Sequence, residues 1–516
     1  MKYYKYILIL ATLATALGSC SKDFVTLYPE GQINGGNFYK TTADFQTALV
    51  GAYTPLRDAA AYAWYCEEMR ADNSKYDRNA DRGGAGYEQI ADFMEDASNG
   101  VPGNIWIAGF KGIQRTNVIL DRIQNPGLSI ADADKNQIVG EAKALRAHYY
   151  FELVRLFGKL PLYLHEVTDS KTAVIDHRSS LDSVYAQIIA DFTDAVSKLG
   201  APVFSSAGVQ SGRATKGMAA TELGLVYLTR KDYANAATIL TTVTNMGYSL
   251  QTNYADVFDP KKKNGRESIF EVQYKSGTDG QQSSFIYSFI PTESNTAGIL
   301  GSNTSFKVTS GGWNYPTDDL VNSYEPGDLR LDASIAISAG HNAPDGTYVP
   351  DSVVSILKTM PPGVIAKRFL RKYYHLPYSL QNNTDDDWPW YRYSDVLLML
   401  AEALNEQGQS GASLPFLNQV RARAGLIAST ETDQTALRAV IAHERRVELA
   451  FENHRWFDLV RTDQAKTVMN AFGVIQKQTF TYLSANSYNV TDDRLVYAIP
   501  FRETQVNPGF GQNHGY

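Results

Sequence analysis

The stretch that decides the fold runs from His443 to Arg461 and reads HERRVELAFENHRWFDLVR. Glu444, Glu448 and Glu452 recur at four-residue spacing with arginines between them, and on a helix such positions are neighbours that can form ion pairs. Large aromatic and aliphatic side chains are mixed with these charges, whereas a solvated amphipathic helix separates the two kinds. Because charges beside aromatics are partly desolvated and need partners, we expect a packed, charge-paired element that joins several parts of the fold. The functional alternative is an acid/base site.

The catalytic motifs that the sequence partly matches lack their essential residues. His443 and Glu444 begin like the HExxH motif of zinc proteases, but Val447 stands where the second metal ligand belongs. Two glycines are spaced as in a phosphate-binding loop, yet Met218 and Ala219 replace the lysine and serine that such a loop needs. No G-x-S-x-G nucleophile elbow occurs. We therefore expect a protein that is not an enzyme.

Composition narrows the function further. The chain has 516 residues, 44% of them hydrophobic and 20% charged, as in ordinary globular proteins. Aromatic residues reach 12%, with 32 tyrosines, an excess expected of surfaces that stack on sugars or peptides, although a core can also absorb it. The net charge is −7 and no lysine- or arginine-rich arm is present, which argues against nucleic acid as a partner.

The first residues predict the destination of the chain. Lys2 and Lys5 precede an apolar run over 7–17 that is too short to span a bilayer and suits the core of a signal peptide over 1–19. The run ends in Leu-Gly-Ser-Cys20, which resembles a bacterial lipobox, so we expect cleavage before Cys20 and lipidation of its sulfur. An ordinary cleaved signal followed by a chance cysteine is the alternative. Cys66 is the only other cysteine, so a lipidated Cys20 leaves no intrachain disulfide.

Helical periodicity dominates residues 41–252. Apolar spacing predicts a helix capped by Thr41, another around Ile113–Ile123, a long one over Asp132–Phe157 and one over Leu181–Leu199. Between 62 and 103 the pattern dissolves into Gly, Asn, Asp and aromatic residues, which predicts long loops.

A tetratricopeptide-like repeat begins at Gly217. Gly224 and Ala236 are the small residues that let its two antiparallel helices approach, and Leu240 fills the space between them. A weaker copy spans Tyr393 to Gly425, with its small residue, Ala412, one position early. The segments at 41–124 and 132–199 could be degenerate copies. Chance helical hairpins explain the weaker copies about as well.

Helical periodicity disappears between Asn253 and Asp387. Ser268 to Tyr274 alternates like a strand, and much of the remainder is rich in Gly, Ser, Asn and Pro. We expect a lipid-anchored tether over 20–40, a helical half over 41–252, a loop-rich insertion over 253–390, and a last helix pair with a closing segment over 391–516.

Several stretches together carry a family resemblance. Their order along the chain is Cys20-Ser21-Lys22-Asp23-Phe24, Arg146-Ala147-His148-Tyr149-Tyr150-Phe151, Arg392-Tyr393-Ser394-Asp395, Val420-Arg421-Ala422-Arg423-Ala424-Gly425, Glu444-Arg445-Arg446-x-Glu448-Leu449 and Asn507-Pro508. The chain resembles the SusD/RagB family of outer-membrane nutrient-binding lipoproteins from Bacteroidetes along its whole length.

The resemblance implies a mainly α fold: a right-handed superhelix of four tetratricopeptide-like helix pairs with a loop-rich, short-strand insertion. Members of the family sit on the cell surface, capture an oligosaccharide or peptide, and act as a lid over a SusC-like TonB-dependent transporter. We therefore expect a non-catalytic glycan receptor anchored to the outer membrane. A binder of peptides or another nutrient, or a surface scaffold without a small ligand, is the alternative.

Aromatic faces with nearby amides and carboxylates are what sugar binding requires. Two regions offer them, at about 62–106 and at 283–315. The candidate ligand-binding residues are Trp64, Tyr65, Asp72, Asn73, Tyr76, Tyr87, Tyr287, Trp313, Asn314 and Tyr315. Each aromatic could instead pack its loop against the body. We expect Trp388, Trp390, Tyr391 and Trp456 to belong to the fold.

One acidic loop has partial calcium-binding spacing. Asp77, Asn79, Asp81 and Glu88 supply oxygens at positions one, three, five and twelve of an EF-hand loop. Arg82 stands where the sharp-turn glycine belongs, so a polar loop that binds ligand or nothing is the alternative. We expect no other cofactor.

Overall fold

The computed structural model describes residues 38–78, 85–169, 173, 175, 177–206, 208, 210–291, 297–301, 311–376, 378 and 380–516. The predicted signal peptide, Cys20 and most of the tether lie outside these ranges. Asn79 and Asp81 of the candidate calcium loop lie outside them too.

Long helices form the N-terminal half. They are α2 (Thr42–Tyr53), α3 (Pro55–Cys66), α4 (Ala85–Asp92), α5 (Gly100–Arg122), α6 (Asp132–Phe157) and α7 (Leu181–Lys198). Thr41 caps α2 through a capping box with Asp44, as its position before the apolar pattern predicts. The α6 helix ends at Gly158, whose φ of 72° lies in the left-handed region that favours glycine.

The expectation of long loops over 62–103 is wrong in part. The α3 helix continues to Cys66, α4 covers 85–92 and α5 begins at Gly100. Trp64 and Tyr65 therefore lie on the buried last turn of a helix. Asp58 is exposed and Arg57 half-buried, but α3 has no other charged residue and residues 63–66 are all buried, so the polar side that identifies a surface helix is short.

The repeat at Gly217 is a helix pair, α8 (Lys216–Thr229) and α9 (Tyr233–Thr244). A Cβ on Gly224 would lie 2.5 Å from Leu240 Cγ, so the absence of a side chain permits the close approach that the sequence predicted. The weaker copy is α14 (Tyr393–Glu406) and α15 (Ser410–Arg423). There the buried small residue is Ser413, whose hydroxyl donates to Ala401 O at 2.7 Å, while Ala412 is exposed.

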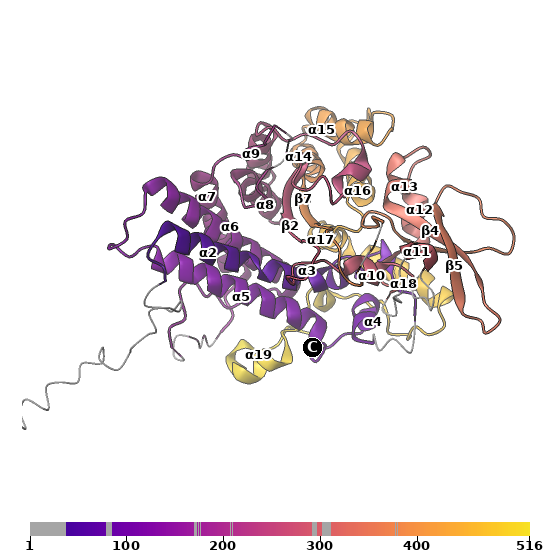
Figure 1. Cartoon of the computed structure of the whole chain (residues 1–516), viewed down its shortest axis with the longest axis horizontal. Helices are drawn as coiled ribbons and strands as arrows, with labels where there is room; N and C mark the ends of the chain where they lie inside the picture. Colours follow the sequence, from indigo (N-terminus) through magenta and orange to yellow (C-terminus); the bar gives the residue numbers. More distant parts are fainter. Residues whose placement is uncertain are drawn as a thin grey trace, which may run out of the picture.

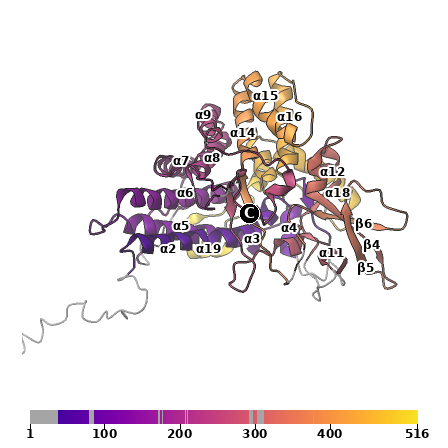
Figure 2. The same cartoon turned by 45° about the horizontal axis from the view of Figure 1, so that its top comes forward.

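Successive helix pairs pack side by side in one curved array. The α5–α6–α7 layer leads into α8 and α9, and α14 packs against α9 although the insertion separates them in sequence (Figures 1 and 2). The mainly helical, tetratricopeptide-like fold expected from the sequence is confirmed.

The insertion contains more sheet than its composition predicts. The predicted strand is β2 (Ser268–Val272), which pairs antiparallel with β7 (Trp388–Arg392) and so ties the two ends of the insertion together. Between them, β4 (Ile335–Asn342), β5 (Tyr348–Ser355) and β6 (Ile365–Leu370) form an antiparallel sheet in the order β5-β4-β6. This sheet lies at the end of the molecule opposite α2 and α7 (Figure 1).

Short elements complete the described part of the insertion. They are η3 (Tyr254–Val257), α10 (Phe285–Phe289), α11 (Ala297–Leu300), β3 (Tyr315–Pro316), α12 (Asp318–Ser323) and α13 (Leu329–Ser334). One of them, β3, pairs antiparallel with β1 (Ser74–Lys75) from the N-terminal half.

The stretch from His443 to Arg461 forms two helices rather than one. The α16 helix (Gln434–Glu448) ends, a tight turn follows with φ of 68° at Phe451 and 70° at Asn453, and α17 (Arg455–Arg461) begins. The chain then closes through α18 (Ala465–Thr479), η4 (Asp492–Leu495), α19 (Phe501–Val506) and η5 (Pro508–Phe510). None of the helices within the described ranges is long and apolar enough to cross a membrane.

Buried arginines from other elements neutralise this stretch. Glu448, with no exposed surface, accepts from Arg330 at 3.1 Å and from Arg392 at 3.0 Å, and it also pairs with Arg423. Arg392 also holds Glu452, at 2.6 Å. The expected charge-paired element is confirmed, but its main partners come from α13, β7 and α15 instead of from the same helix.

Candidate ligand-binding site

The two aromatic regions singled out in the sequence meet in the fold. Lys75 pairs with Tyr315 and Ser74 with Pro316 across the β1–β3 ladder. On either side of the ladder, Asp77 N donates to Gly312 O at 2.7 Å and Thr317 N donates to Asn73 O at 3.0 Å. Two loops far apart in sequence therefore share one short antiparallel connection.

Rings from both regions pack into one cluster behind this ladder. The Tyr65 ring stacks on Trp64 at 3.5 Å and on Tyr87 at 4.1 Å between centroids. Trp313 meets the edge or face of Tyr65, Tyr76 and Tyr87 at 5.6, 5.9 and 5.4 Å. Trp64, Tyr65, Tyr76 and Trp313 are buried, whereas Tyr87 is half-buried. The cluster positions the ladder, and of its five rings Tyr87 has the most surface to offer a ligand.

Asp72 and Asn73 fasten the ladder to the charged stretch. Arg455 binds the Asp72 carboxylate through two nitrogens at 2.8 and 2.9 Å, and Arg446 lies 3.0 Å from it. Burial acts to raise the pKa of Asp72, but the two arginines outweigh it and the pKa lies below its ordinary value. Asn73 donates to Glu68 at 3.2 Å and accepts from Arg446 Nε at 2.9 Å. Both side chains are buried and occupied within the fold.

The remaining predicted residues divide between core and surface. Tyr287 is buried and its hydroxyl donates to Leu380 O at 2.9 Å. Asn314 is fully buried with φ 53°, and no hydrogen-bond partner for its amide atoms occurs among the described residues. Tyr315 is half-buried. Direct ligand contact by the ten residues stays a prediction, with Tyr87 and Tyr315 the best placed for it.

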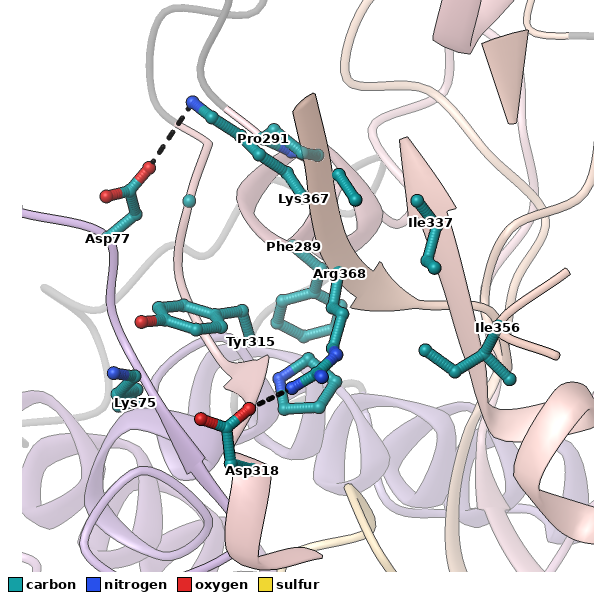
Figure 3. A pocket seen from close by; sticks show the side chains of 13 residues that line it. Lys75, Asp77, Phe289, Pro291, Tyr315, Asp318, Ile337, Ile356, Lys367 and Arg368 are labelled. Atoms are coloured by element: carbon teal, nitrogen blue, oxygen red, sulfur yellow. Dashed lines mark hydrogen bonds and ion pairs between the residues drawn. The ribbon is translucent and has the colours of Figure 1, made fainter. Parts of the chain in front are cut away.

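A cavity of about 520 Å³ opens between the ladder and the three-stranded sheet (Figure 3). Its apolar side is formed by Phe289, Pro291, Ile337 and Ile356, and its rim carries Lys75, Asp77, Tyr315, Asp318, Lys367 and Arg368. An apolar wall with a few convergent polar groups is the usual make-up of a small-ligand site. Of the ten predicted residues, Tyr315 is the one that lines this cavity.

Most of the rim residues are not predicted from the sequence. Lys367 and Arg368 come from β6, Asp318 begins α12 and Lys75 is half of β1. No local motif marks them, because their proximity depends on strand pairing across the insertion. Residues 365–370 read IAKRFL, which lacks the apolar and polar alternation of a half-buried strand, so the sequence contains no clear signal for β6.

The rim charges are partly matched. Arg368 forms an ion pair with Asp318, and Lys367 Nζ lies 3.6 Å from Asp77 Oδ2 (Figure 3). The Lys75 ammonium lies 5.0 Å from the centroid of the Tyr315 ring, and burial lowers the pKa of Lys75 to about 8. This arrangement can stack a ring-shaped ligand and hydrogen-bond its polar groups.

A second cavity, of about 420 Å³, bears on the acid/base alternative for the opening stretch. Its charged lining is already paired: Arg445 with Asp395 at 2.6 Å, and Arg461 with Asp458 at 2.7 Å and with Glu402. Such pairing favours a structural role for these groups over proton transfer.

The calcium hypothesis stays a prediction. Asp77 lies on the cavity rim and Glu88 lies on α4, while the other two candidates are outside the described ranges. Within those ranges, no group of three His, Cys, Asp or Glu side chains is arranged to hold a metal ion.

Two family models match the chain in consecutive parts. The model described as "SusD family" matches residues 266–516, and the one described as "Starch-binding associating with outer membrane" matches residues 34–228. A SusD-like protein of Formosa agariphila is 28% identical over 552 aligned residues, covering 100% of both chains. A SusD-like protein of Bacteroides ovatus is 26% identical, covering 88% of this chain and 82% of its own.

Solved structures agree. A laminarin-binding SusD-like protein superposes with a TM-score of 0.73 at 26% identity, covering 93% of this chain and 100% of its own. Surface glycan-binding protein A of Bacteroides uniformis, at 22% identity and a TM-score of 0.72, covers 92% of this chain and 99% of its own and shares the fold. Together with the family models and the shared helix-pair architecture, these matches identify the chain as a member of the SusD family.

Proposed function

We propose that the protein is a glycan-binding receptor whose ligand enters the cavity between the β1–β3 ladder and the β4–β6 sheet. The observation that carries the proposal is that both aromatic regions reach this cavity, where the half-buried Tyr315 and charged groups line the rim above an apolar wall. Sugar rings stack on aromatic faces through their C–H groups, and their hydroxyls hydrogen-bond to charged and polar side chains. The laminarin-binding relative supports the same ligand class.

Calorimetry of the chain without its first 19 residues tests this proposal. A panel of polysaccharides should give heat of binding, and Tyr315→Ala should weaken it at least about fivefold, the loss expected for one stacking ring. Tyr233→Ala, which removes a half-buried ring from α9 at a different cavity, is the matched control and should bind like the parent. Binding of oligopeptides and of no glycan would instead favour the peptide receptor.

We also propose that the receptor is lipid-anchored at the outer membrane and passes its glycan to a SusC-like TonB-dependent transporter without cleaving it. The lipobox at Cys20 and the family description support the location, and the resemblance supports the partner. Mild detergent extraction of outer membranes with a tagged chain should recover such a transporter in near-equal amount. Recovery of the tagged chain alone would contradict the partnership, and release of new reducing ends from a bound glycan would contradict the absence of cleavage.

A further inference from the structure

Lys75 is the one basic side chain on the cavity rim whose described surroundings hold no counter-ion. Its ammonium lies 3.5 Å from the centroid of the Phe480 ring and 5.0 Å from that of Tyr315. Among the described residues, no acidic side chain lies within ion-pair distance of it and no hydrogen-bond acceptor binds it. Two neutral ring faces are therefore its immediate partners.

The neighbouring carboxylates are directed at other cations. Asp318 pairs with Arg368, and Asp77 lies 3.6 Å from Lys367. Among the described residues, the rim thus carries three cationic side chains and two carboxylates, in a chain whose net charge is −7. The described part of the rim is therefore more positive than the chain as a whole.

A lysine buried for structural reasons looks different in this protein. The Lys372 ammonium, fully enclosed, lies 2.6 Å from a Glu452 oxygen and donates to Ala450 O at 2.7 Å. Burial lowers the pKa of both lysines to about 8, so what sets Lys75 apart is geometry. Among the described residues, its ammonium has neither a carboxylate nor a carbonyl oxygen within bonding distance, and Asp318 and Asp77 act on it only at longer range. A desolvated ammonium without a counter-ion gains most from a ligand that brings one.

We propose that this cavity selects glycans that carry an anionic group, the carboxylate of a uronic acid or a sulfate ester, and that Lys75 is the charge partner of that group. The inference rests on the proposed function and names its ligand class. The sugar ring lies against Tyr315 and the apolar wall, while the anionic substituent faces the Lys75 ammonium.

Matched ligand pairs test it in calorimetry with the chain lacking its first 19 residues. One pair is oligogalacturonate and its methyl ester, the second is carrageenan oligosaccharides and their desulfated form, and laminarin oligosaccharides are the neutral reference. At least one charged member should bind about tenfold more tightly than its uncharged counterpart. Which pair responds tells a carboxylate from a sulfate.

Substitutions test whether Lys75 causes the preference for the charged ligand. Lys75→Met should abolish the difference within the responding pair without changing affinity for the uncharged member, and Lys75→Arg should restore part of it. The control is Lys466→Met, which removes a half-exposed lysine paired with Asp492, away from this cavity. If Lys75→Met fails to fold, the unsubstituted protein still tests the inference. Added salt and a pH rise from 7 to 9 should each weaken its binding of the charged ligand and leave its binding of the uncharged ligand unchanged. The other charged groups that act on Lys75 are Asp77, Asp318 and Arg368.

Three results would overturn the inference. Equal affinity for charged and uncharged members, unchanged charged-ligand affinity in Lys75→Met, or binding of laminarin oligosaccharides alone would each remove Lys75 as an anion partner. In all three the protein remains a glycan receptor. Binding of no glycan at all would remove the proposed function together with this inference.

Discussion

Substitution of Glu448 by glutamine tests the role of the charged stretch most directly. Glu448 has no exposed surface, and its carboxylate lies against Arg330, Arg392 and Arg423. Burial acts to raise the pKa of Glu448, but the arginines outweigh it and hold the pKa well below its ordinary value. A neutral amide of the same shape leaves three buried guanidinium groups short of one negative charge, and its NH₂ group faces donors.

The expected loss of stability is large. Removing one partner of a buried ion pair costs about 3–5 kcal/mol, because the other charge stays in the interior. Unfolding entropy for a chain of this length is roughly 1 kcal/mol per kelvin if it unfolds as one unit. We therefore expect Glu448→Gln to lower Tm by about 3–5 °C.

Differential scanning calorimetry measures this shift, and an exposed ion pair supplies the control. Asp182, whose side chain is 83% exposed, pairs with Arg230 on the surface. Asp182→Asn should change Tm by less than about 1 °C, since exposed pairs contribute little. Glycan affinity of folded Glu448→Gln, measured well below its Tm, should equal that of the parent.

Two outcomes would refute this reasoning. A Glu448→Gln protein that melts like the parent would show that the buried network does not stabilise the fold. A variant with parental Tm that no longer binds glycan would place the stretch in the ligand site itself, as the acid/base alternative supposed.

Three further predictions concern other parts of the chain. Gly224→Val should lower Tm by about 1–3 °C, because its side chain would collide with Leu240, whereas Gly51→Ala, with open space around its Cβ on α2, should leave Tm equal or slightly higher; equal effects of the two would contradict close packing in the α8–α9 pair. Cys20→Ala should move the protein from the membrane fraction to the soluble fraction of lysed cells, and continued membrane association would contradict the lipid anchor. Below pH about 4.3, the ordinary glutamate pKa, the parent should lose stability steadily, because Glu448 then binds a proton in the unfolded chain while its depressed pKa keeps it ionised in the folded protein. Glu448→Gln should therefore show a shallower loss of Tm between pH 5 and 3. Parallel curves for the two proteins would contradict the lowered pKa of Glu448.

The sequence predicts those parts of the fold whose signals lie within a short stretch of chain. Residues 132–157 and 217–240 have helical spacing, caps and small residues within a few positions of one another, so their helices and their pairing follow from nearby residues. The strands β4 to β6 were missed, because β4 is rich in small residues and β5 contains Pro350, which β5 tolerates as an edge strand.

The site depended on contacts that no local pattern encodes. Aromatic composition pointed to the two regions that meet at the cavity. Trp64 and Trp313, however, both pack against Tyr65 in the core, whereas Lys75 and Arg368 line the cavity. Helical spacing likewise placed Glu444 and Glu448 beside arginines of their own helix, but a buried carboxylate is best served by guanidinium groups that approach from several directions. Those arginines come from other elements, and the sequence does not order them in space.

The β1–β3 ladder also limits when the cavity can form during folding, because it joins two distant parts of the chain. Lys75 and Tyr315 are partners across some 240 positions of chain, and closing so long a loop is slow compared with forming the helix pairs. During synthesis, which starts at the N-terminus, Tyr65 and Tyr76 lack Trp313, and Trp64 lacks Phe289, until the insertion has been made. A fragment ending near residue 252 would leave those rings exposed and should aggregate. It would also form no binding cavity, so ligand binding should appear only after the insertion has folded.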